Sequence, residues 1–406
     1  MRLTILNQYY PPDLAPTGRL AASLAEHRAG MGDQVAVVTG RGRYVSGTAL
    51  APTAGANQVR IHRLWTPGLG RGNLARRLID YAWFYLAAAV RLVSLPRQDL
   101  IISLTTPPFV AWTAVLHGWL HPATRLILWN MDCFPEALIR AALVPENGWV
   151  ARLLRWQNHW LIRQLDRVVC LDPAMERLLA AEYAGADRPL PTCVVPNWEP
   201  FGRFDSQATA AKWDLSEVLG TELPPYVIHM GNAGYGHDFA TTAEAAQALQ
   251  AEPVGFVFIG GGARWSWLEA AKHERALANW HLIPYLPEDQ LAAALSGALC
   301  ALITLRDSFL GVISPSKLHA ALALGLPVLY IGPEGSNVDE AIRRYGCGVS
   351  LRHGDVQGVI GFLRRLTGDT RFHEDLRRRA RTAFGCAYTD RQALPAFDAL
   401  IEELRR

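Results

Sequence analysis

The sequence predicts an α/β protein built from two doubly wound parallel sheets, and two observations support this prediction. Short β-like runs alternate with helix-length segments along almost the whole chain, which is the pattern of parallel strands joined by crossover helices. The chain has 406 residues, more than the roughly 250 to 300 at which one hydrophobic core stops growing. We therefore expect two domains of ordinary size with a cleft between them.

The expected strands form two series. In the first half they are short apolar runs, each followed by a turn or a helix-length segment. They cover residues 3–6, 34–38, 59–64, 100–104, 125–129, 167–171 and 193–196. A second series begins at Tyr226 with YVIHMG and continues through VGFVFIG, WHLIPY, ALCALITL, PVLYIG and CGVSL. Each series predicts one sheet.

The periodicity is weakest between residues 197 and 225, where proline, glycine and polar residues interrupt it. The domain boundary is expected in this stretch, with an N-terminal domain over residues 1–203 and a C-terminal domain over residues 204–387. The last segment, residues 388–406, has the apolar spacing of a helix that can cap either domain. Its apolar stripe consists of Leu394, Phe397, Leu400, Ile401 and Leu404.

The composition excludes several classes of protein. Half of the residues are apolar and 19% are charged, which is too little charge for a disordered or nucleic-acid-coating chain. The net charge of +3 gives no reason to expect a nucleic-acid partner. The six cysteines are scattered, without a CxxC pair or zinc-like spacing among the twelve histidines. The N-terminal MRLTILNQYYPP lacks the apolar region of a signal peptide. We expect a cytoplasmic protein without a metal.

Residues 73–97, NLARRLIDYAWFYLAAAVRLVSLPR, are aromatic and apolar with arginines at both ends. A membrane span needs about 20 predominantly apolar residues, and Asp80 and Arg91 leave too short a run. A helix lying in the membrane interface fits better. Its expected headgroup contacts are Arg76, Arg77, Arg91 and Arg97, and its expected acyl-boundary residues are Trp83, Phe84 and Leu86. An ordinary buried crossover helix is the alternative.

The segment SPSKLHAALALG, residues 314–325, follows an expected strand and a loop. Ser314 suits an N-cap, Pro315 the first helical position and Gly325 the helix end. The helix then begins at the carboxyl edge of a parallel sheet, where ligands bind in open α/β folds and free N–H groups favour an anion. Lys317 in the first turn is electrostatically misplaced unless a negative group such as a diphosphate is near. A solvated surface lysine is the alternative.

Two glycine-containing loops are further candidates for phosphate contacts. The loop HMGNAGYGHDF, residues 229–239, ends the first strand of the second domain. Its Gly231, Gly234 and Gly236 let the backbone approach a ligand closely. The first loop of the N-terminal domain, YYPPDLAPTGRL, carries Gly18 just before a helix and is expected to face the same cleft.

Four polar side chains could take part in chemistry. Asp132 and Glu136, in NMDCFPEALIR, follow an expected strand of the first domain and can project toward an acceptor hydroxyl. Asp132 is the candidate acceptor-side base or positioning group, with an N-cap or a surface carboxylate as the alternative. His237 and His319 can donate to phosphate or ribose oxygens, whereas single histidines are more often structural.

The chain contains, in order, QYYPPDLAPTGRLAASLAEHRAGMGDQVAVVT, TTPPFV, LWNMDCFPEAL, VPNW, HMGNAGYGHD, FVFIGGG, PYLPEDQLAAALSGA and ISPSKLHAALALGLPVLYIGPEGSNVDEAI. In this order and spacing they resemble glycosyltransferase family 4, particularly the colanic-acid and O-antigen branch of bacterial surface-polysaccharide assembly. The resemblance covers nearly the whole chain. It implies a GT-B fold with the nucleotide sugar on the C-terminal domain, the acceptor on the N-terminal domain, and retaining transfer without a metal or other cofactor.

The resemblance also assigns site residues by position. Gly18 matches the N-terminal loop glycine near the donor phosphates. The family's pyrophosphate loop corresponds to the stretch with Gly231, Asn232, Gly234 and His237, and its Pro-Ser-Lys element contains Ser316 and Lys317.

The sequence departs from the family pattern at two places. Two glutamates separated by seven residues are replaced here by Gly311 and His319. The basic pair of the pyrophosphate loop is replaced by Asn232 and His237, so Lys317 is the main cation left for the leaving diphosphate. The missing glutamates support one alternative, a catalytically silent GT-B partner or scaffold that binds nucleotide sugar. A GT-B nucleotide-sugar epimerase is a second alternative, and it would need an acid/base set in the cleft that the sequence does not display.

The expected function is transfer of a hexosyl or N-acetylhexosaminyl group from a nucleotide sugar, by analogy a UDP-sugar, to a glycan or polyprenyl-diphosphate-linked acceptor. Residues 73–97 would hold the protein on the inner face of the cytoplasmic membrane. A strand-linked GxGxxG with a downstream acid is absent from the sequence, which argues against a dinucleotide-dependent dehydrogenase.

Overall fold

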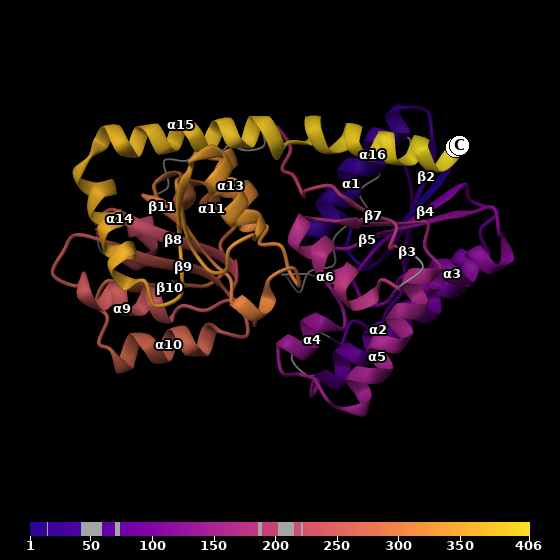
Figure 1. Cartoon of the computed structure of the whole chain (residues 1–406), viewed down its shortest axis with the longest axis horizontal. Helices are drawn as coiled ribbons and strands as arrows, with labels where there is room; N and C mark the ends of the chain where they lie inside the picture. The colour runs from indigo at the N-terminus through magenta and orange to yellow at the C-terminus, as the bar shows by residue number, and fades with distance from the viewer. Residues whose placement is uncertain (14, 42–58, 70–73, 186–188, 202–214, 221) are drawn as a thin grey trace. The chain divides into compact units, whose positions relative to one another are not determined.

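The computed structural model describes residues 1–13, 15–41, 59–69, 74–185, 189–201, 215–220 and 222–406 (Figure 1). The chain divides into two compact units. Unit 1 holds Met1–Pro196 and Leu394–Arg406, and unit 2 holds Asn197–Ala393. The chain therefore leaves unit 1 once and returns to it through its last helix. The boundary expected between residues 203 and 204 lies outside the described residues, as does residue 73 of the expected membrane segment.

Unit 1 is built on a parallel sheet with the order β3-β2-β1-β4-β5-β6-β7. Every expected strand of the first half is present, and the inner strands β4 and β5 are continuous apolar runs because they are buried on both faces. The strands are β1 (Arg2–Leu6), β2 (Gln34–Gly40), β3 (Val59–Leu64), β4 (Leu100–Leu104), β5 (Arg125–Trp129), β6 (Arg167–Cys170) and β7 (Thr192–Val194).

Helices cover both faces of this sheet. Right-handed crossovers place α1 on one face and α2, α3 and α5 together on the other (Figure 1). The helices are α1 (Pro16–Gly30), α2 (Leu74–Val93), α3 (Ala111–Leu120), α4 (Glu136–Arg140), α5 (Trp149–Arg163), α6 (Pro173–Tyr183) and the terminal α16 (Asp390–Arg405).

The end of α16 packs into unit 1. Phe397 is buried with its ring 4.7 Å from that of Trp129 at the end of β5. Asp398 accepts from the buried guanidinium of Arg28 in α1 at 2.8 Å and lies 2.7 Å from His27. The expected apolar stripe and this ion pair together explain why the helix covers unit 1, a choice that the sequence left open.

Unit 2 contains the second parallel sheet, with the order β10-β9-β8-β11-β12-β13. All six expected strands are present: β8 (Tyr226–Asn232), β9 (Gly255–Gly261), β10 (Trp280–Ile283), β11 (Cys300–Thr304), β12 (Val328–Ile331) and β13 (Gly348–Leu351). The surrounding helices are α8 (Leu215–Leu219), α9 (Ala240–Ala248), α10 (Trp265–Glu274), α11 (Glu288–Ser296), η1 (Asp307–Phe309), α12 (Lys317–Ala323), α13 (Asn337–Tyr345), α14 (Val356–Gly368) and α15 (Thr370–Ala387).

The strand order locates one binding edge in each sheet. The first strand of each unit, β1 or β8, pairs with its successor on one side and with β4 or β11 on the other. The chain thus reverses direction across the sheet beside β1 and β8. In open α/β sheets ligands bind outside the carboxyl ends of the strands at this reversal.

Helix α12 begins later than the sequence predicts. The expected N-cap was Ser314, but the helix starts at Lys317 and Ser316 is the capping residue, without a side-chain hydrogen bond to the helix. The reason is a tight first turn, in which Leu318 N donates to Pro315 O and His319 N to Ser316 O, both three residues back. Gly325, at a φ of +66°, follows the helix end as expected.

Helix α2 has the structure of the alternative offered for residues 73–97. It is a crossover helix that buries Phe84, Ala88 and Leu92, so the expected lipid contact of Phe84 is wrong. Arg91 is also not a headgroup arginine, because it is half-buried with its guanidinium 3.0 Å from the His62 ring. The outward face nevertheless exposes Leu78, Ile79, Trp83, Leu86, Val90 and Val93. No helix in the described ranges is long and apolar enough to cross a membrane.

Candidate functional site

The candidate site of unit 2 begins with two glycine loops at the carboxyl ends of β8 and β9. A Cβ on Gly260 would lie 2.1 Å from Gly231 O, and a Cβ on Gly262 would lie 2.2 Å from Asn232 Oδ1. Glycine is required at both positions because the two loops lie backbone to backbone. The Ala233 N–H also donates to Gly261 O at 2.7 Å. These contacts fix the start of the predicted phosphate loop rigidly on the sheet.

The structure brings Asn232, His237 and Lys317 together at this edge. Lys317 Nζ donates to the Asn232 carbonyl at 3.0 Å and lies 3.0 Å from His237 Nε2. His237 Nδ1 in turn lies 2.8 Å from the carbonyl oxygen of Thr304, the last residue of β11. The three predicted residues therefore meet where β8 and β11 end, which is the reversal point of this sheet.

Burial sets the protonation of this cluster. His237 is buried, and burial and the nearby Lys317 hold its pKa well below the usual range. It is therefore neutral, with Nδ1–H donating to Thr304 O and Nε2 accepting from the ammonium. Burial also lowers the pKa of Lys317 to about 8, so the ammonium keeps its proton at pH 7. The cluster carries one positive charge.

The charge on Lys317 has no counterion in the described part of the chain. An ammonium has three donors, and two of them are used by Asn232 O and His237 Nε2. The third is free for a ligand oxygen. Lys317 is also one of only three lysines, against 37 arginines, so a compact point charge stands where this chain ordinarily uses a guanidinium.

Backbone donors lie next to this ammonium in the chain segment that ends at His237. Within the described residues the N–H groups of Gly234, Tyr235 and Gly236 have no hydrogen-bond acceptor. A Cβ on Gly236 would lie 2.5 Å from Ile313 Cδ1, so glycine lets this turn lie on the loop before α12. Consecutive free N–H groups beside a cation form an anion-binding nest.

The other two residues predicted on α12 have different surroundings. Ser316 is exposed, and its hydroxyl makes no capping bond to the helix. His319 is buried, with Nδ1 3.1 Å from Ser316 O and its ring 5.4 Å from that of Tyr388. Burial lowers the pKa of His319 to about 4, so it is neutral. Its bonding neighbours are not Lys317 and His237, and its contact with a donor stays a prediction.

Unit 1 offers Gly18 and Asp132 at the carboxyl edge of its own sheet. A Cβ on Gly18 would lie 3.1 Å from the Tyr9 carbonyl carbon, so glycine lets α1 start against the loop after β1. Asp132 follows β5, and its N–H donates to Thr105 Oγ1 at 3.2 Å. Its half-buried carboxyl has no ion-pair partner in the described ranges, and burial raises its pKa to about 6. Such a pKa suits a proton acceptor near neutrality.

Glu136, the second carboxylate of this segment, has a structural role. It is buried, accepts from Tyr183 Oη at 2.9 Å and pairs with Arg155 at 3.3 Å. The expectation that it projects toward an acceptor is therefore wrong, because its oxygens bind two side chains of the same unit. Only Asp132 is left without such partners.

Comparison with known proteins identifies the family. Residues 17–198 match the model of the glycosyl transferase 4-like domain. Over 340 residues the chain is 25% identical to the colanic acid biosynthesis glycosyl transferase WcaI of Escherichia coli strain K12, covering 80% of this chain and 82% of that protein. The chain carries a glycosyl transferase 4-like domain over residues 17–198. It is an enzyme that transfers a glycosyl group, and the predicted resemblance is confirmed.

Solved structures show that this glycosyltransferase has the GT-B fold. Sucrose-phosphate synthase of Thermosynechococcus elongatus superposes with a TM-score of 0.71 at 14% identity, over 100% of this chain and 99% of that one. Alr3699/HepE of Anabaena, solved in complex with UDP, superposes with a TM-score of 0.68 at 12% identity, over 99% and 100%. At identities this low, the similarity establishes a shared fold and does not establish a shared substrate or mechanism.

The sequence interpretation missed one residue of the site, Thr304, and one buried carboxylate elsewhere in unit 2, Asp339. Thr304 orients His237, and no local signal marks it. Asp339 in α13 is buried and accepts from Gly335 N at 2.9 Å and from Arg352 at 3.1 Å. Burial would raise the pKa of Asp339, but hydrogen bonds, that from Ser350 foremost, hold it below its usual range. The S-x-x-D spacing from Ser336, which caps α13 at 3.1 Å, was the available signal.

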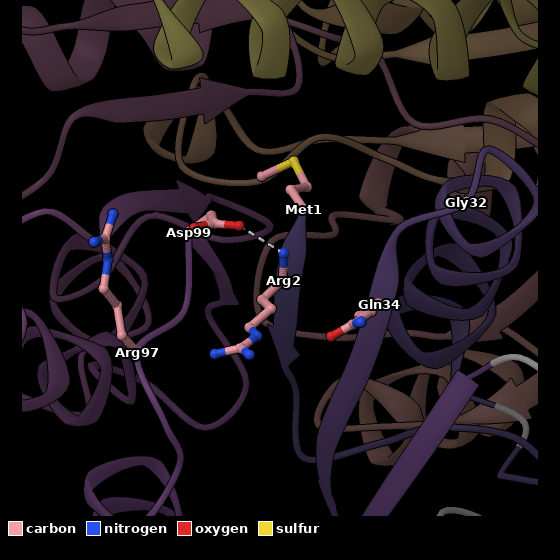
Figure 2. Close-up of a pocket in the computed structure, with 6 residues that line it drawn as sticks. All are labelled: Met1, Arg2, Gly32, Gln34, Arg97 and Asp99. Atoms are coloured by element: carbon pink, nitrogen blue, oxygen red, sulfur yellow. Dashed lines mark hydrogen bonds between the residues drawn. The ribbon is translucent and has the colours of Figure 1, made fainter.

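Figure 2 shows a cleft of about 380 Å³ in unit 1 of the glycosyltransferase. It lies at the amino ends of β1, β2 and β4, opposite the edge where ligands bind in open α/β sheets. The Asp99 carboxylate in it already accepts from Arg2 N at 2.7 Å. This cleft is therefore not a candidate donor site. Its lining residues are Met1, Arg2, Gly32, Gln34, Arg97 and Asp99.

Proposed function

We propose that this glycosyltransferase moves a sugar from a nucleoside diphosphate sugar bound by unit 2 to an acceptor hydroxyl bound by unit 1. The observation that carries the proposal is the Lys317 ammonium, which has one free donor, no carboxylate partner in the described residues and a nest of backbone N–H groups beside it. A diphosphate supplies the missing negative charge. Neutral His237 holds the ammonium in place without competing for the anion.

The proposed reaction balances with the residues available. The acceptor oxygen bonds to the anomeric carbon while the bond from that carbon to the β-phosphate oxygen breaks, and the electron pair leaves with the diphosphate. Lys317 and the N–H groups of residues 234–236 stabilise the developing charge. The hydroxyl proton passes to Asp132 or to the departing phosphate oxygen. Transfer with retention of configuration and without a metal follows from the family and belongs to the proposal.

We propose uridine diphosphate as the carrier. It is supported by the fold, which is shared with a protein solved with UDP. Because the WcaI relative carries the name of a colanic acid enzyme, the proposed pathway is bacterial surface-polysaccharide synthesis. The proposed acceptor is a glycan carried on a polyprenyl diphosphate.

The first test measures the binding of UDP, GDP, ADP and TDP by calorimetry, in EDTA, to the wild type and to Lys317→Ala. We expect one nucleotide, UDP, to bind without added metal and to bind at least about tenfold more weakly to the variant, because one charge-assisted hydrogen bond is lost. Lys272→Ala, which removes a lysine of α10 in the same unit, is the control and should bind normally. Equal affinity of Lys317→Ala, or binding only with a divalent metal, would contradict this proposal.

One observation favours a second candidate function. Gly311 and His319 occupy the positions of the family's paired glutamates, and His319 is buried and neutral. A nucleotide-sugar-binding protein without transferase activity would need no glutamates there. One assay distinguishes the two functions. A transferase moves labelled sugar to an acceptor lipid, whereas a scaffold binds the nucleotide and transfers no labelled sugar.

We also propose that α2 brings unit 1 to the cytoplasmic face of the membrane, where a polyprenyl-linked acceptor resides. The exposed apolar stripe of α2 and the exposed Arg76, Arg77 and Arg97 support this. Aromatic and aliphatic side chains suit the acyl boundary and arginines suit anionic headgroups.

The test is sedimentation with vesicles that contain phosphatidylglycerol. Arg76→Glu with Arg97→Glu should lower the vesicle partition coefficient about tenfold or more, because each basic residue near an anionic surface contributes about 1 kcal/mol. The control reverses two exposed arginines elsewhere, Arg371→Glu with Arg406→Glu, and should bind like the wild type. If both double variants bind equally well, α2 does not contact the membrane through these residues.

A further inference from the structure

The surface of unit 1 has a second unusual feature beside α2. Thirteen of the 21 large apolar side chains that are exposed in the described residues lie on α2, α3 and α5, whereas unit 2 contributes four. On α5 the exposed fractions are 74% for Trp149, 60% for Trp156 and 53% for Trp160, and on α3 the fraction is 60% for Trp119. Other tryptophans of the chain are buried, as Trp129 and Trp280 are.

The exposed apolar residues of α5 recur at the spacing of one helix face. Trp149, Leu153, Trp156 and Trp160 recur at intervals of four, three and four residues, so they form one stripe along the outward face of the helix. The opposite face buries Ala151, Asn158, Leu161 and Ile162 in unit 1. A helix that is apolar toward both the core and the outside is not an ordinary surface helix.

The charged side chains on α3 and α5 themselves have one sign, although Glu146 and Glu182 lie 3.8 and 4.0 Å from Arg155. Neither α3 nor α5 contains an aspartate or a glutamate, and α5 carries Arg152, Arg155 and Arg163. Arg155 pairs with Glu136, while Arg152 and Arg163 are exposed and have no carboxylate partner in the described part of the chain. Free arginines beside exposed tryptophans match an anionic lipid surface, since indole rings prefer the headgroup level and guanidinium groups bind phosphates.

The two helices are held as one surface. Trp112 Nε1 on α3 donates to Gln157 on α5 at 2.7 Å, and the rings of Trp112 and Trp119 lie 6.4 Å apart. Helix α3 packs against α2 on its other side, and the three helices lie together on one face of the sheet (Figure 1). The second surface therefore continues the α2 surface instead of standing apart from it.

We propose that α3 and α5 form a second lipid-contacting face, in which Trp119, Trp149, Trp156 and Trp160 enter the interface of an anionic bilayer. This inference deepens the membrane part of the proposed function and rests on it. The three-helix surface would give unit 1 a broad attachment instead of a single-helix anchor, and so would fix the orientation of the acceptor-binding sheet toward the lipid.

The test uses the full chain with Trp149→Ser, Trp156→Ser and Trp160→Ser combined, which leaves every charge and all of α2 unchanged. We expect binding to vesicles with phosphatidylglycerol to weaken about tenfold or more, because the buried apolar area is lost. In the wild type, brominated acyl chains should quench tryptophan fluorescence, and this quenching should fall in the variant. Met31→Ser with Val218→Ser, two exposed apolar side chains off this surface, is the control. Trp156→Ser alone serves if the triple variant melts early.

The outcomes separate this inference from the proposed function. Retained UDP affinity in the triple variant together with lost vesicle binding supports the second face. Unchanged vesicle binding and quenching overturn it, even where Arg76→Glu with Arg97→Glu releases the protein. If sedimentation velocity shows a lipid-free wild-type dimer that the triple variant abolishes, the face belongs to a second copy of the chain and the inference is wrong. A wild type that binds no vesicles overturns the whole membrane proposal and leaves nucleotide binding untouched.

Discussion

Replacing Lys317 by alanine is expected to lower kcat by about 10²-fold or more, the scale for losing one preorganised partner of a transition-state charge. The side chain places an ammonium at the reversal point of the unit 2 sheet, and within the described ranges no other cation shares its contacts to Asn232 O and His237. The loss in kcat should exceed the loss in UDP affinity, because charge on the diphosphate grows as the glycosidic bond breaks. Initial rates with saturating labelled donor sugar measure it.

Two further variants make this result interpretable. Lys272→Ala should keep the wild-type kcat, since that lysine lies on α10 away from the glycine loop. Lys317→Arg should not restore full activity, because a planar guanidinium cannot reproduce the contacts of an ammonium with the Asn232 carbonyl and His237 Nε2. A kcat for Lys317→Ala within threefold of the wild type would remove Lys317 from the reaction.

Asp132→Asn is expected to lower kcat by about 10²-fold, the lower end of the range for general bases, and to change the pH profile. Burial raises the pKa of Asp132 to about 6, so the carboxylate that accepts a proton exists above pH 6 and disappears as the pH falls below it. Wild-type activity should therefore decline below about pH 6. The asparagine variant has no such titration and should lose that decline, as measured by kcat between pH 5 and pH 8.

Stability provides an independent readout for the same variant. The pKa of Asp132 is higher in the folded chain than in the unfolded chain, so the charged form costs stability, and this cost grows as the pH rises through the window from about 4 to 6. Asp132→Asn should thus raise Tm at pH 7 while lowering activity. Glu146→Gln, an exposed carboxylate of the same unit, is the control. If kcat still declines at low pH in Asp132→Asn, the decline is caused by the titration of another group.

Most of the fold was predictable because its physical signal is local. Strands β4 and β5 have the bounds expected from the sequence, since a strand buried on both faces must be a short, continuous apolar run. The edge strand β3, VRIHRL, also has the expected bounds, because its apolar residues alternate with polar ones. The terminal helix was predictable from its stripe, because Phe397 and Ile401 recur at helical spacing. Its attachment to unit 1 was not, because Arg28 and Asp398 are 370 residues apart.

The candidate site was only partly predictable. Glycines after a strand and a lysine in the first turn of a helix are local signals, and they named Gly231 and Lys317. The alternation of strands and helices along the chain does not reveal the order of the strands in the sheet. It therefore could not show that β11 lies beside β8. Only this order places Thr304 where it orients His237 toward Lys317. The buried pairing of Glu136 with Tyr183 and Arg155 was invisible for the same reason.

The sequence by itself determined the fold class and the strands and singled out Lys317, because apolar runs, glycine loops and motif order are local features of the chain. The tertiary structure decided which side of each helix is covered. Phe84 is buried and Trp83 is exposed although they are neighbours on α2, and Trp156 and Trp160 of α5 are exposed. Burial depends on what packs against a face, and that is fixed only when distant strands and helices assemble.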